Sequence, residues 1–337
     1  MTVTSRSTIR QVAERAGVSR MTVSRVLSDG SHSVSEETRK RVLAAVRELE
    51  YVPVAQPTMQ SRRIETRIIG LVFDGTPFEG PFGLPTFIGL REGAKKYNYD
   101  LLTLIRDTPD WMLGKEELQF LDWRCDGIIF ISPQDRSKTI EALIRYKIPV
   151  VCCYSDEAPA EVPCVISDNF GVMYKMTNLL IKNGHTGIMH VGPCTERLDF
   201  QMRQEGYKQA MLDAGLEPVV FLLDYKKERS VRGFLKQIKA HHITALNCFS
   251  DTQAFCAWDV CMVNDINIPQ QMSITGMDNA RQEAISRGLT TATVPFEQAG
   301  GCAFEIMMQL IKGEAELVQG EVLPFQIIER TSVRRLK

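Results

Sequence analysis

The chain has 337 residues, of which 44% are hydrophobic and 24% charged, and this composition and length predict a soluble protein of two or three domains. Its net charge of −1 conceals a division, because residues 1–63 hold eleven Lys or Arg and six Asp or Glu, whereas the rest holds 29 and 35. No apolar run reaches the roughly 18 residues of a membrane span and the first residues lack a signal-peptide pattern, which argues against membrane and secreted classes and predicts a cytoplasmic protein.

Residues 8–27, TIRQVAERAGVSRMTVSRVL, contain two short helical patterns joined at a glycine. In the first pattern, apolar residues recur at spacings of three and four, which places them on one face of a helix. Gly17 suits the positive φ that ends a helix, and Ser19 suits the cap of the next one. A short helix with polar and cationic side chains outside fits the major groove of DNA, while an ordinary pair of packed helices is the alternative. The outward residues of the second helix are Arg20, Met21, Thr22, Ser24 and Arg25.

A third helix is expected from about Ser35, which caps it, to about Leu49. The three helices make residues 1–52 a small helix-turn-helix head, and its basic excess suits contact with DNA phosphates. Residues 53–66 include Pro53 and Pro57 and are expected to form a hinge or linker.

From residue 68 onward, short apolar runs alternate with helical patterns. Repeated units of this kind predict an α/β core of two doubly wound parallel-sheet subdomains behind the all-α head. We expect a core at 67–337, with one subdomain at about 67–164 plus 295–325 and the other at about 165–294 plus 326–337. The expected strands are 68–73, 126–131, 149–154, 164–168, 187–192, 219–224, 245–251 and 273–278.

Four of these apolar runs end in an aspartate. Ligands of such sheets bind beyond the carboxyl ends of the strands, so these carboxylates are candidates for a ligand site. Each could instead only cap the helix that follows. The four residues are Asp168, Asp224, Asp251 and Asp278.

Longer strings resemble one family in order along nearly the whole chain. TIRQVAERAGVSRMTVSRVL and VSEETRKRVLAAVRELEYVP resemble the DNA-binding head of lactose-repressor-type (LacI/GalR family) transcription regulators. VISDN, NLLIKNGHTGIMHVGP, RQEGYKQAMLDAG, SITGMDN and FQIIERTSV resemble that family's periplasmic-binding-protein-like core. The resemblance implies a homodimer that binds a pseudo-palindromic operator in double-stranded DNA, with repression as the expected sign. It also implies control by a small effector, usually a sugar or a sugar derivative, and a cytoplasmic, nucleoid-associated location.

The resemblance assigns base contacts to the second helix of the head. Arg can pair with the O6 and N7 of guanine, and Met21 can contact a thymine methyl group. Hydroxyl side chains can donate to phosphates and cap helices at the same time. The DNA-binding residues implied are Thr8, Ser19, Arg20, Met21, Thr22, Ser24, Arg25 and Met59.

The linker departs from the family pattern, in which a short helix inserts a leucine into the minor groove. Gln60 stands where that leucine is expected, and Pro57 falls within the expected helix. Pro57 could begin a shorter helix with Met59 as the inserted residue. Otherwise the linker stays extended and Arg62 and Arg63 follow phosphates.

In the core, the resemblance implies that an Asp and Arg set binds the effector. Such side chains suit vicinal sugar hydroxyls or an anionic group. Tyr154 stands where many relatives have Asp, and Phe82 could line the site or serve packing. The effector-binding residues expected are Phe82, Asp168, Arg197, Arg203, Tyr225, Asp251 and Asp278.

The runner-up class is an enzyme or a free sugar-binding protein on the same core. The chain has no G-x-x-x-x-G-K-[ST], G-x-G-x-x-G or G-x-S-x-G motif, and His190 in its apolar run is expected to be a satisfied core residue. The nine cysteines show no ligand spacing, so reduced thiols and no metal or cofactor are expected. A third hypothesis remains open, in which the chain is a constitutive DNA-binding protein with a vestigial core.

Overall fold

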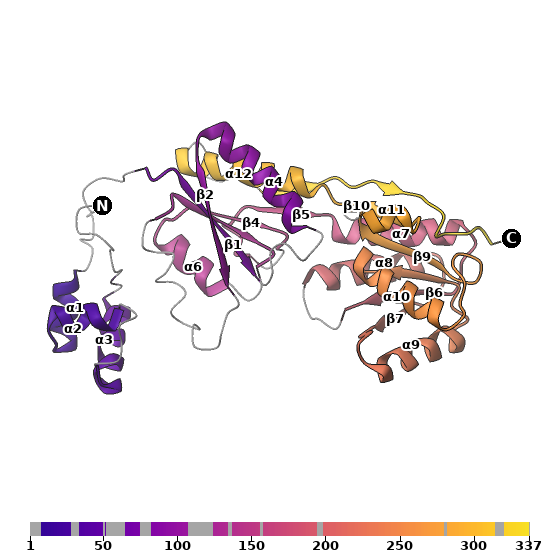
Figure 1. The fold of residues 1–337 in the computed structure, drawn as a ribbon, viewed down its shortest axis with the longest axis horizontal. Coiled ribbons are helices and arrows are strands. Elements are labelled where there is room, and N and C mark those ends of the chain that lie inside the picture. Colours follow the sequence, from indigo (N-terminus) through magenta and orange to yellow (C-terminus); the bar gives the residue numbers. More distant parts are fainter. Residues whose placement is uncertain are drawn as a thin grey trace.

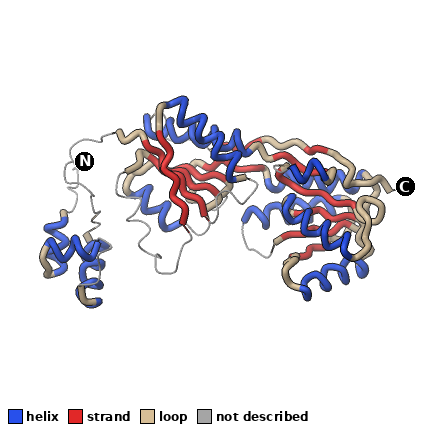
Figure 2. Tube along the Cα trace, viewed as in Figure 1, coloured by secondary structure: helices blue, strands red, loops and turns tan. Residues whose placement is uncertain are grey.

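The computed structural model describes residues 8–27, 34–49, 51, 65–74, 82–106, 124–133, 137–155, 158–193, 198–279, 282–313 and 320–336. They form a helical head and two α/β subdomains, each built on one six-stranded sheet (Figures 1 and 2). The predicted fold class is confirmed. No helix among these residues is long and apolar enough to cross a membrane.

The head consists of α1 (Ile9–Ala16), α2 (Arg20–Leu27) and α3 (Glu36–Glu48). Val12, Val23 and Val42, one from each helix, are fully buried in its small core. Gly17 ends α1 with a φ of 64°, a conformation that glycine adopts without steric cost. The hydroxyl of Ser35 accepts a hydrogen bond of 3.3 Å from the Thr38 amide and caps α3. The head therefore follows its sequence signals closely.

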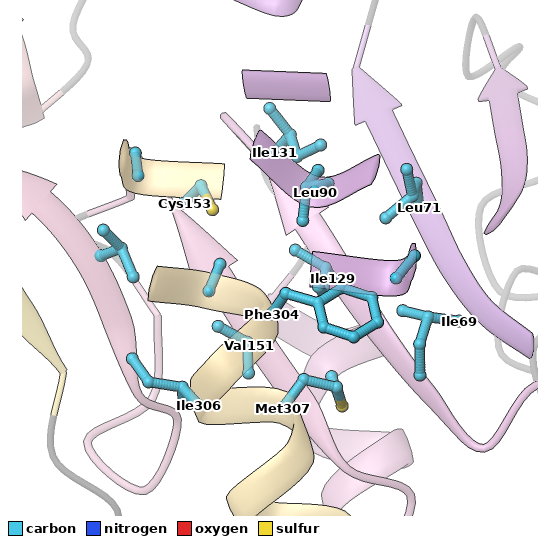
Figure 3. Packing of buried hydrophobic residues seen from close by; sticks show 14 of the residues in the cluster. Ile69, Leu71, Leu90, Ile129, Ile131, Val151, Cys153, Phe304, Ile306 and Met307 are labelled. Atoms are coloured by element: carbon cyan, nitrogen blue, oxygen red, sulfur yellow. The ribbon is translucent and has the colours of Figure 1, made fainter. Parts of the chain in front are cut away.

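The first subdomain contains sheet A, in the order β11-β5-β4-β3-β1-β2, with every pair of strands parallel. Alternate residues of these strands face α4 and α12 on one side and α6 on the other. Figure 3 shows the α12 side, where Phe304 packs among aliphatic residues of β1, β3 and β4. The strands are β1 (Ile68–Asp74), β2 (Asp100–Arg106), β3 (Gly127–Ile131), β4 (Val150–Cys153), β5 (Cys164–Ser167) and β11 (Glu321–Leu323), and the helices are α4 (Gly83–Tyr97), α6 (Ser137–Arg145) and α12 (Phe296–Lys312).

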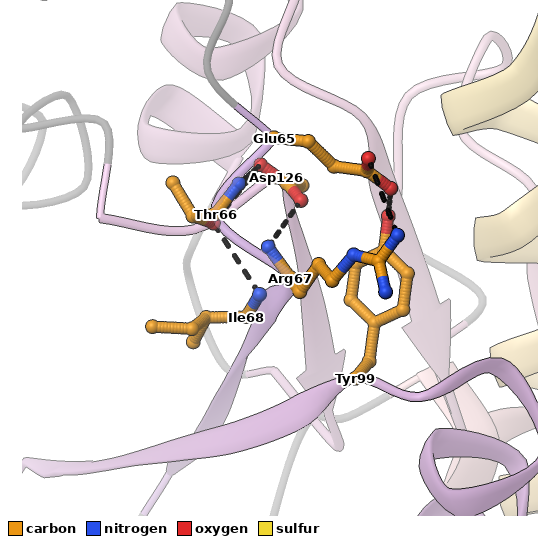
Figure 4. Close-up of polar contacts among 6 residues, drawn as sticks. All are labelled: Glu65, Thr66, Arg67, Ile68, Tyr99 and Asp126. Atoms are coloured by element: carbon orange, nitrogen blue, oxygen red, sulfur yellow. Dashed lines mark hydrogen bonds and ion pairs between the residues drawn. The ribbon is translucent and has the colours of Figure 1, made fainter.

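One carboxylate fixes the position at which the chain enters the first strand of sheet A. Asp126 accepts hydrogen bonds from the backbone N–H groups of Thr66 and Arg67, both at 2.8 Å, and from the Thr66 hydroxyl at 2.9 Å (Figure 4). These bonds tie the segment just before β1 to the loop just before β3. The end of the linker is therefore anchored to the sheet.

The second subdomain contains sheet B, in the order β12-β10-β9-β8-β6-β7, parallel except for the pair β10–β12. Helices α9, α10 and α11 cover one face, and α7 and α8 cover the other. The strands are β6 (Ile188–Gly192), β7 (Val219–Leu222), β8 (Ala245–Cys248), β9 (Ser273–Asp278), β10 (Thr290–Thr293) and β12 (Ile327–Ile328), and the helices are α7 (Asn169–Lys182), α8 (Leu198–Asp213), α9 (Glu228–Ala240), α10 (Asp251–Val263) and α11 (Gln282–Ser286).

The chain passes between the subdomains at three places: from β5 to α7, from β10 to α12, and from β11 to β12. Strand β5 belongs wholly to sheet A, so the first passage follows Ser167. Strands β2, β10, β11 and β12 were not among the expected runs. Three of them have only two to four residues, too few to give a periodic signal.

Candidate DNA-reading helix and effector site

Helix α2 presents a cationic and polar surface. Val23 and Val26 are buried against the head core, while Met21 is 64% exposed and Arg20, Ser24 and Arg25 are exposed. Within the described part of the chain, neither Arg20 nor Arg25 has an ion-pair partner. Both guanidinium groups are therefore available to an external acceptor such as a guanine edge.

The hydroxyl groups of the head act in helix capping. The Thr8 hydroxyl accepts from the Gln11 amide and the Gln11 side chain accepts from the Thr8 amide at 2.7 Å, a reciprocal capping box. The Ser19 oxygen accepts from the Thr22 amide at 3.1 Å, and the two hydroxyls lie 2.9 Å apart. These side chains fix the two helices whether or not they also contact phosphates. Met59, Pro57 and Gln60 lie outside the described residues.

In the core, Arg203 of α8 is held beside the start of α7. Its Nε donates to Asn169 Oδ1 and its Nη1 to the backbone oxygen of Phe249, both at 2.8 Å. The guanidinium carbon lies 4.1 Å from the centre of the Phe249 ring, a cation–π distance. Asp168, the exposed residue next to Asn169, caps α7 by accepting from the Gly171 amide at 2.7 Å. The structure thus brings two predicted residues, Asp168 and Arg203, to one place.

Asp251 plays a different part, because it is only 1% exposed. Its carboxylate accepts from the Thr291 hydroxyl at 2.5 Å and from the Asn279 amide at 2.9 Å. Asn279 in turn accepts from Arg330 at 2.7 Å. Asp251 therefore fixes the turn that follows Asp278, itself 7% exposed, and its role in shaping the site is indirect in this structure.

Phe82 belongs to an aromatic cluster at the junction of the subdomains. Its ring centre lies 5.8 Å from that of Tyr154 and 6.3 Å from that of Phe296. The Tyr154 hydroxyl is 2.8 Å from the Thr86 hydroxyl, and burial raises the pKa of Tyr154 well above its usual value. Because this phenol is buried and hydrogen-bonded, it packs here as a structural group.

The remaining candidates are Tyr225, which lies in an exposed loop, and Arg197, which lies outside the described residues. Tyr225 is 50% exposed in the loop after β7, where Lys227 pairs with Asp224 at 2.9 Å and lowers the pKa of that carboxyl. Arg197 falls in the segment 194–197, outside the described residues. The sequence did not identify Asn169, Phe249 or Arg330 as site residues. These residue types indicate a site only when their long-range contacts are known, and those contacts come from the tertiary structure.

His190 differs from the expectation of a satisfied core residue. It is fully buried between the rings of Phe200 and Tyr207, with centre distances of 5.8 and 5.3 Å. Neither ring nitrogen makes a hydrogen bond of normal geometry with a described residue, although Asn247 of the neighbouring strand β8 lies close to the ring. Burial lowers the pKa of the imidazole to about 3, and the positive charge of Arg203 contributes. The burial was predicted correctly, but the satisfaction of its polar atoms was not.

Comparison with known proteins agrees with this architecture. Residues 8–54 match the family described as "Bacterial regulatory proteins, lacI family", and residues 66–330 match "Periplasmic binding proteins and sugar binding domain of LacI family". The chain belongs to the LacI family. This LacI-family chain is accordingly a DNA-binding transcription regulator and not an enzyme, as the sequence predicted.

Similar LacI-family proteins span the same length. The chain is 29% identical to the HTH-type transcriptional regulator RegA of Clostridium saccharobutylicum, covering 97% of this chain and 99% of that protein. It is 30% identical to the HTH-type transcriptional repressor PurR of Vibrio campbellii, covering 98% and 99%.

Solved LacI-family structures share the fold. The transcriptional regulator CelR–cellobiose complex gives a TM-score of 0.72 at 24% identity, covering 97% of this chain and all of the other. The lac repressor dimer bound to operator and the anti-inducer ONPF gives 0.68 at 22% identity, covering 98% and 100%.

Proposed function

We propose that this regulator is a repressor that binds a pseudo-palindromic operator through α2 and releases or holds it in response to a small effector in the core. The observation that carries the proposal is the surface of α2, where Arg20, Met21 and Arg25 are exposed and both guanidinium groups are without ion pairs among the described residues. Base-reading positions need such available side chains.

The test begins with selection of a binding site from a pool of random duplexes. On the selected site, Arg25→Ala should lower the ratio of specific to random-sequence affinity by roughly 5–150-fold, the equivalent of about 1–3 kcal/mol for one base contact. Lys40→Ala, which removes an exposed cation of α3, is the matched control and should weaken both duplexes alike. Equal losses on both duplexes for Arg25→Ala would refute the base-reading role.

For the effector, we propose a sugar-like molecule bound near Asp168, Arg203, Asp278 and Tyr225, with Phe82 and Asp251 shaping the surroundings. The Arg203–Asn169 contact supports this, because it places a donor-rich and acceptor-rich pair at the start of α7. Relatives named above include a regulator solved with cellobiose. Arg197 is kept in the proposed set on the family resemblance alone.

A panel of monosaccharides, disaccharides, sugar phosphates and nucleobases can be screened by thermal shift. A ligand present at 100 times its Kd should stabilise the core by about 2.7 kcal/mol. Arg203→Gln should abolish that shift, while Arg91→Gln, an exposed change on α4, should keep it. If no compound alters either stability or operator binding, the constitutive DNA-binding alternative replaces the effector proposal.

We further propose that the functional unit is a homodimer associated with the nucleoid. Met262 and Val263 at the end of α10 are 50% and 83% exposed, and Ile285 of the neighbouring α11 is 55% exposed. Arg287, which directly follows α11, pairs with Asp259 of α10 at 2.6 Å. Val263→Glu should halve the mass measured by light scattering and weaken operator binding, whereas Leu212→Glu, at a position 60% exposed on α8, should do neither.

A further inference from the structure

The core carries a strongly basic segment on a body that is acidic in total. Residues 225–242 hold six Lys or Arg and a single acidic residue, Glu228, while the rest of residues 64–337 holds 23 Lys or Arg against 34 Asp or Glu. Most of this segment is helix α9, which lies on the outer side of the second subdomain (Figure 1). Positive charge in the second subdomain is therefore concentrated locally on this one helix.

The cations of α9 lie along one side of the helix. Arg229, Arg232, Lys236 and Lys239, here called the α9 stripe, are all exposed and are separated by three, four and three residues. That spacing keeps them on one face, which extends over about 15 Å from first to last. The opposite face carries Phe234 and Ile238, both buried against sheet B. The α9 stripe is thus a straight row on a firmly packed helix.

The row is poorly neutralised by the protein itself. Arg232 pairs with Glu228 at 3.3 Å, but these side chains are 71% and 81% exposed, so the pair is weak. For Arg229, Lys236 and Lys239 no ion pair with any described residue is present. Three of the four cations are therefore available to an external anion.

We propose that the α9 stripe is a second contact surface for duplex DNA, separate from the reading helix of the head. Its four charges over about 15 Å approach the density of one DNA strand, which presents a phosphate about every 3.4 Å. Binding to a phosphate backbone does not require a pocket, so an exposed row of cations on a helix surface is sufficient. DNA that is bound by the head stays close to the core, which raises the local concentration of DNA around the α9 stripe.

Other occupants fit these observations less well. A helix that inserts into a membrane surface needs exposed apolar side chains, but Phe234 and Ile238 of α9 are buried in the core. A second copy of this chain offers acidic groups, yet it would have to present them in a matching row. The experiment below separates these possibilities from DNA.

The test measures how affinity for a random-sequence duplex of about 30 base pairs depends on salt. Full-length wild-type protein is compared with the quadruple variant Arg229→Gln/Arg232→Gln/Lys236→Gln/Lys239→Gln. The matched control is Arg91→Gln/Lys95→Gln/Lys175→Gln/Lys182→Gln, four exposed cations on α4 and α7. Both variants change net charge equally and keep the head intact, and glutamine preserves helix propensity. Circular dichroism and thermal unfolding verify that both are folded.

Each phosphate contact contributes about −0.9 to the slope of log K against log salt. If three or four stripe contacts form, the wild type should lose about 40–150-fold more affinity than the stripe variant between 50 and 200 mM salt. The control should keep the wild-type slope. Equal slopes for wild type and stripe variant would overturn the proposal. So would a stripe variant that changes only the oligomeric state, because the occupant would then be a second copy.

Discussion

Acid should destabilise this protein in a way that depends on His190. The ring is fully buried between Phe200 and Tyr207, and burial lowers the pKa of the imidazole to about 3, against 6.5 in the unfolded chain. Above pH 6.5 the imidazole is neutral in both states and has no effect on the pH dependence. Between pH 6.5 and about 3 the unfolded state binds one more proton than the folded state, so stability falls as pH is lowered.

The size of the effect follows from the pKa difference. One pH unit inside this window is worth about 1.4 kcal/mol per proton, so lowering the pH from 6.5 to 5 should cost about 2 kcal/mol through His190 alone. His185, fully buried and bonded to Thr244 and the Arg334 oxygen, has its pKa lowered by burial as well and adds to the loss. Only a substitution at position 190 isolates the larger contribution.

The assay is urea unfolding at pH 7 and pH 5, monitored by tryptophan fluorescence, to which Trp258, packed against the core of sheet B, contributes. In His190→Leu, the loss of unfolding free energy between the two pH values should be about 2 kcal/mol smaller than in wild type. His241→Gln, at an exposed position, should behave as wild type. An identical pH dependence in His190→Leu and wild type would show that His190 does not remain neutral in the folded core.

Three further outcomes are expected from substitutions elsewhere. Gly89→Ala should destabilise by about 1–3 kcal/mol in urea unfolding, because a Cβ there would lie 1.9 Å from the Glu297 oxygen, whereas Gly301→Ala meets no atom within 4 Å and should be neutral or stabilising. Equal effects of the two would contradict the tight packing of α4 on α12. Thr8→Ala should lower head stability by roughly 1 kcal/mol through loss of the capping box, seen as a lower melting temperature of the head signals in NMR. Asp251→Asn should cost about 1–3 kcal/mol, since an amide cannot accept both buried hydrogen bonds; unchanged unfolding would show that these bonds are dispensable.

The elements with strong local signals were the ones predicted from sequence. Gly17 and Ser35 mark a helix end and a helix cap by conformational preference and side-chain chemistry, and the structure has both. The apolar runs at β1, β6 and β9 are buried on both faces and are recognisable as strands. Short strands such as β12 owe their existence to their neighbours, so no periodicity within them could be found.

The candidate site was predicted less completely, for a related reason. Asp168, Arg203 and Asp278 carry chemistry that the sequence displays directly. What Asp251 does depends on Thr291, forty residues away, and what Arg203 does depends on Phe249. Long-range partners of this kind are set by strand order, which a single sequence does not contain.

Strands β11 and β12 bear on the folding of the chain during synthesis. Strands β11 and β12 lie at residues 321–328 and occupy the outer positions beside β5 and β10, one in each sheet. Until residues 321–328 have left the ribosome, β5 and β10 remain bare edges with unpaired backbone groups. Such edges favour aggregation between nascent chains, so the chain is more prone to aggregate before β11 and β12 have formed than after.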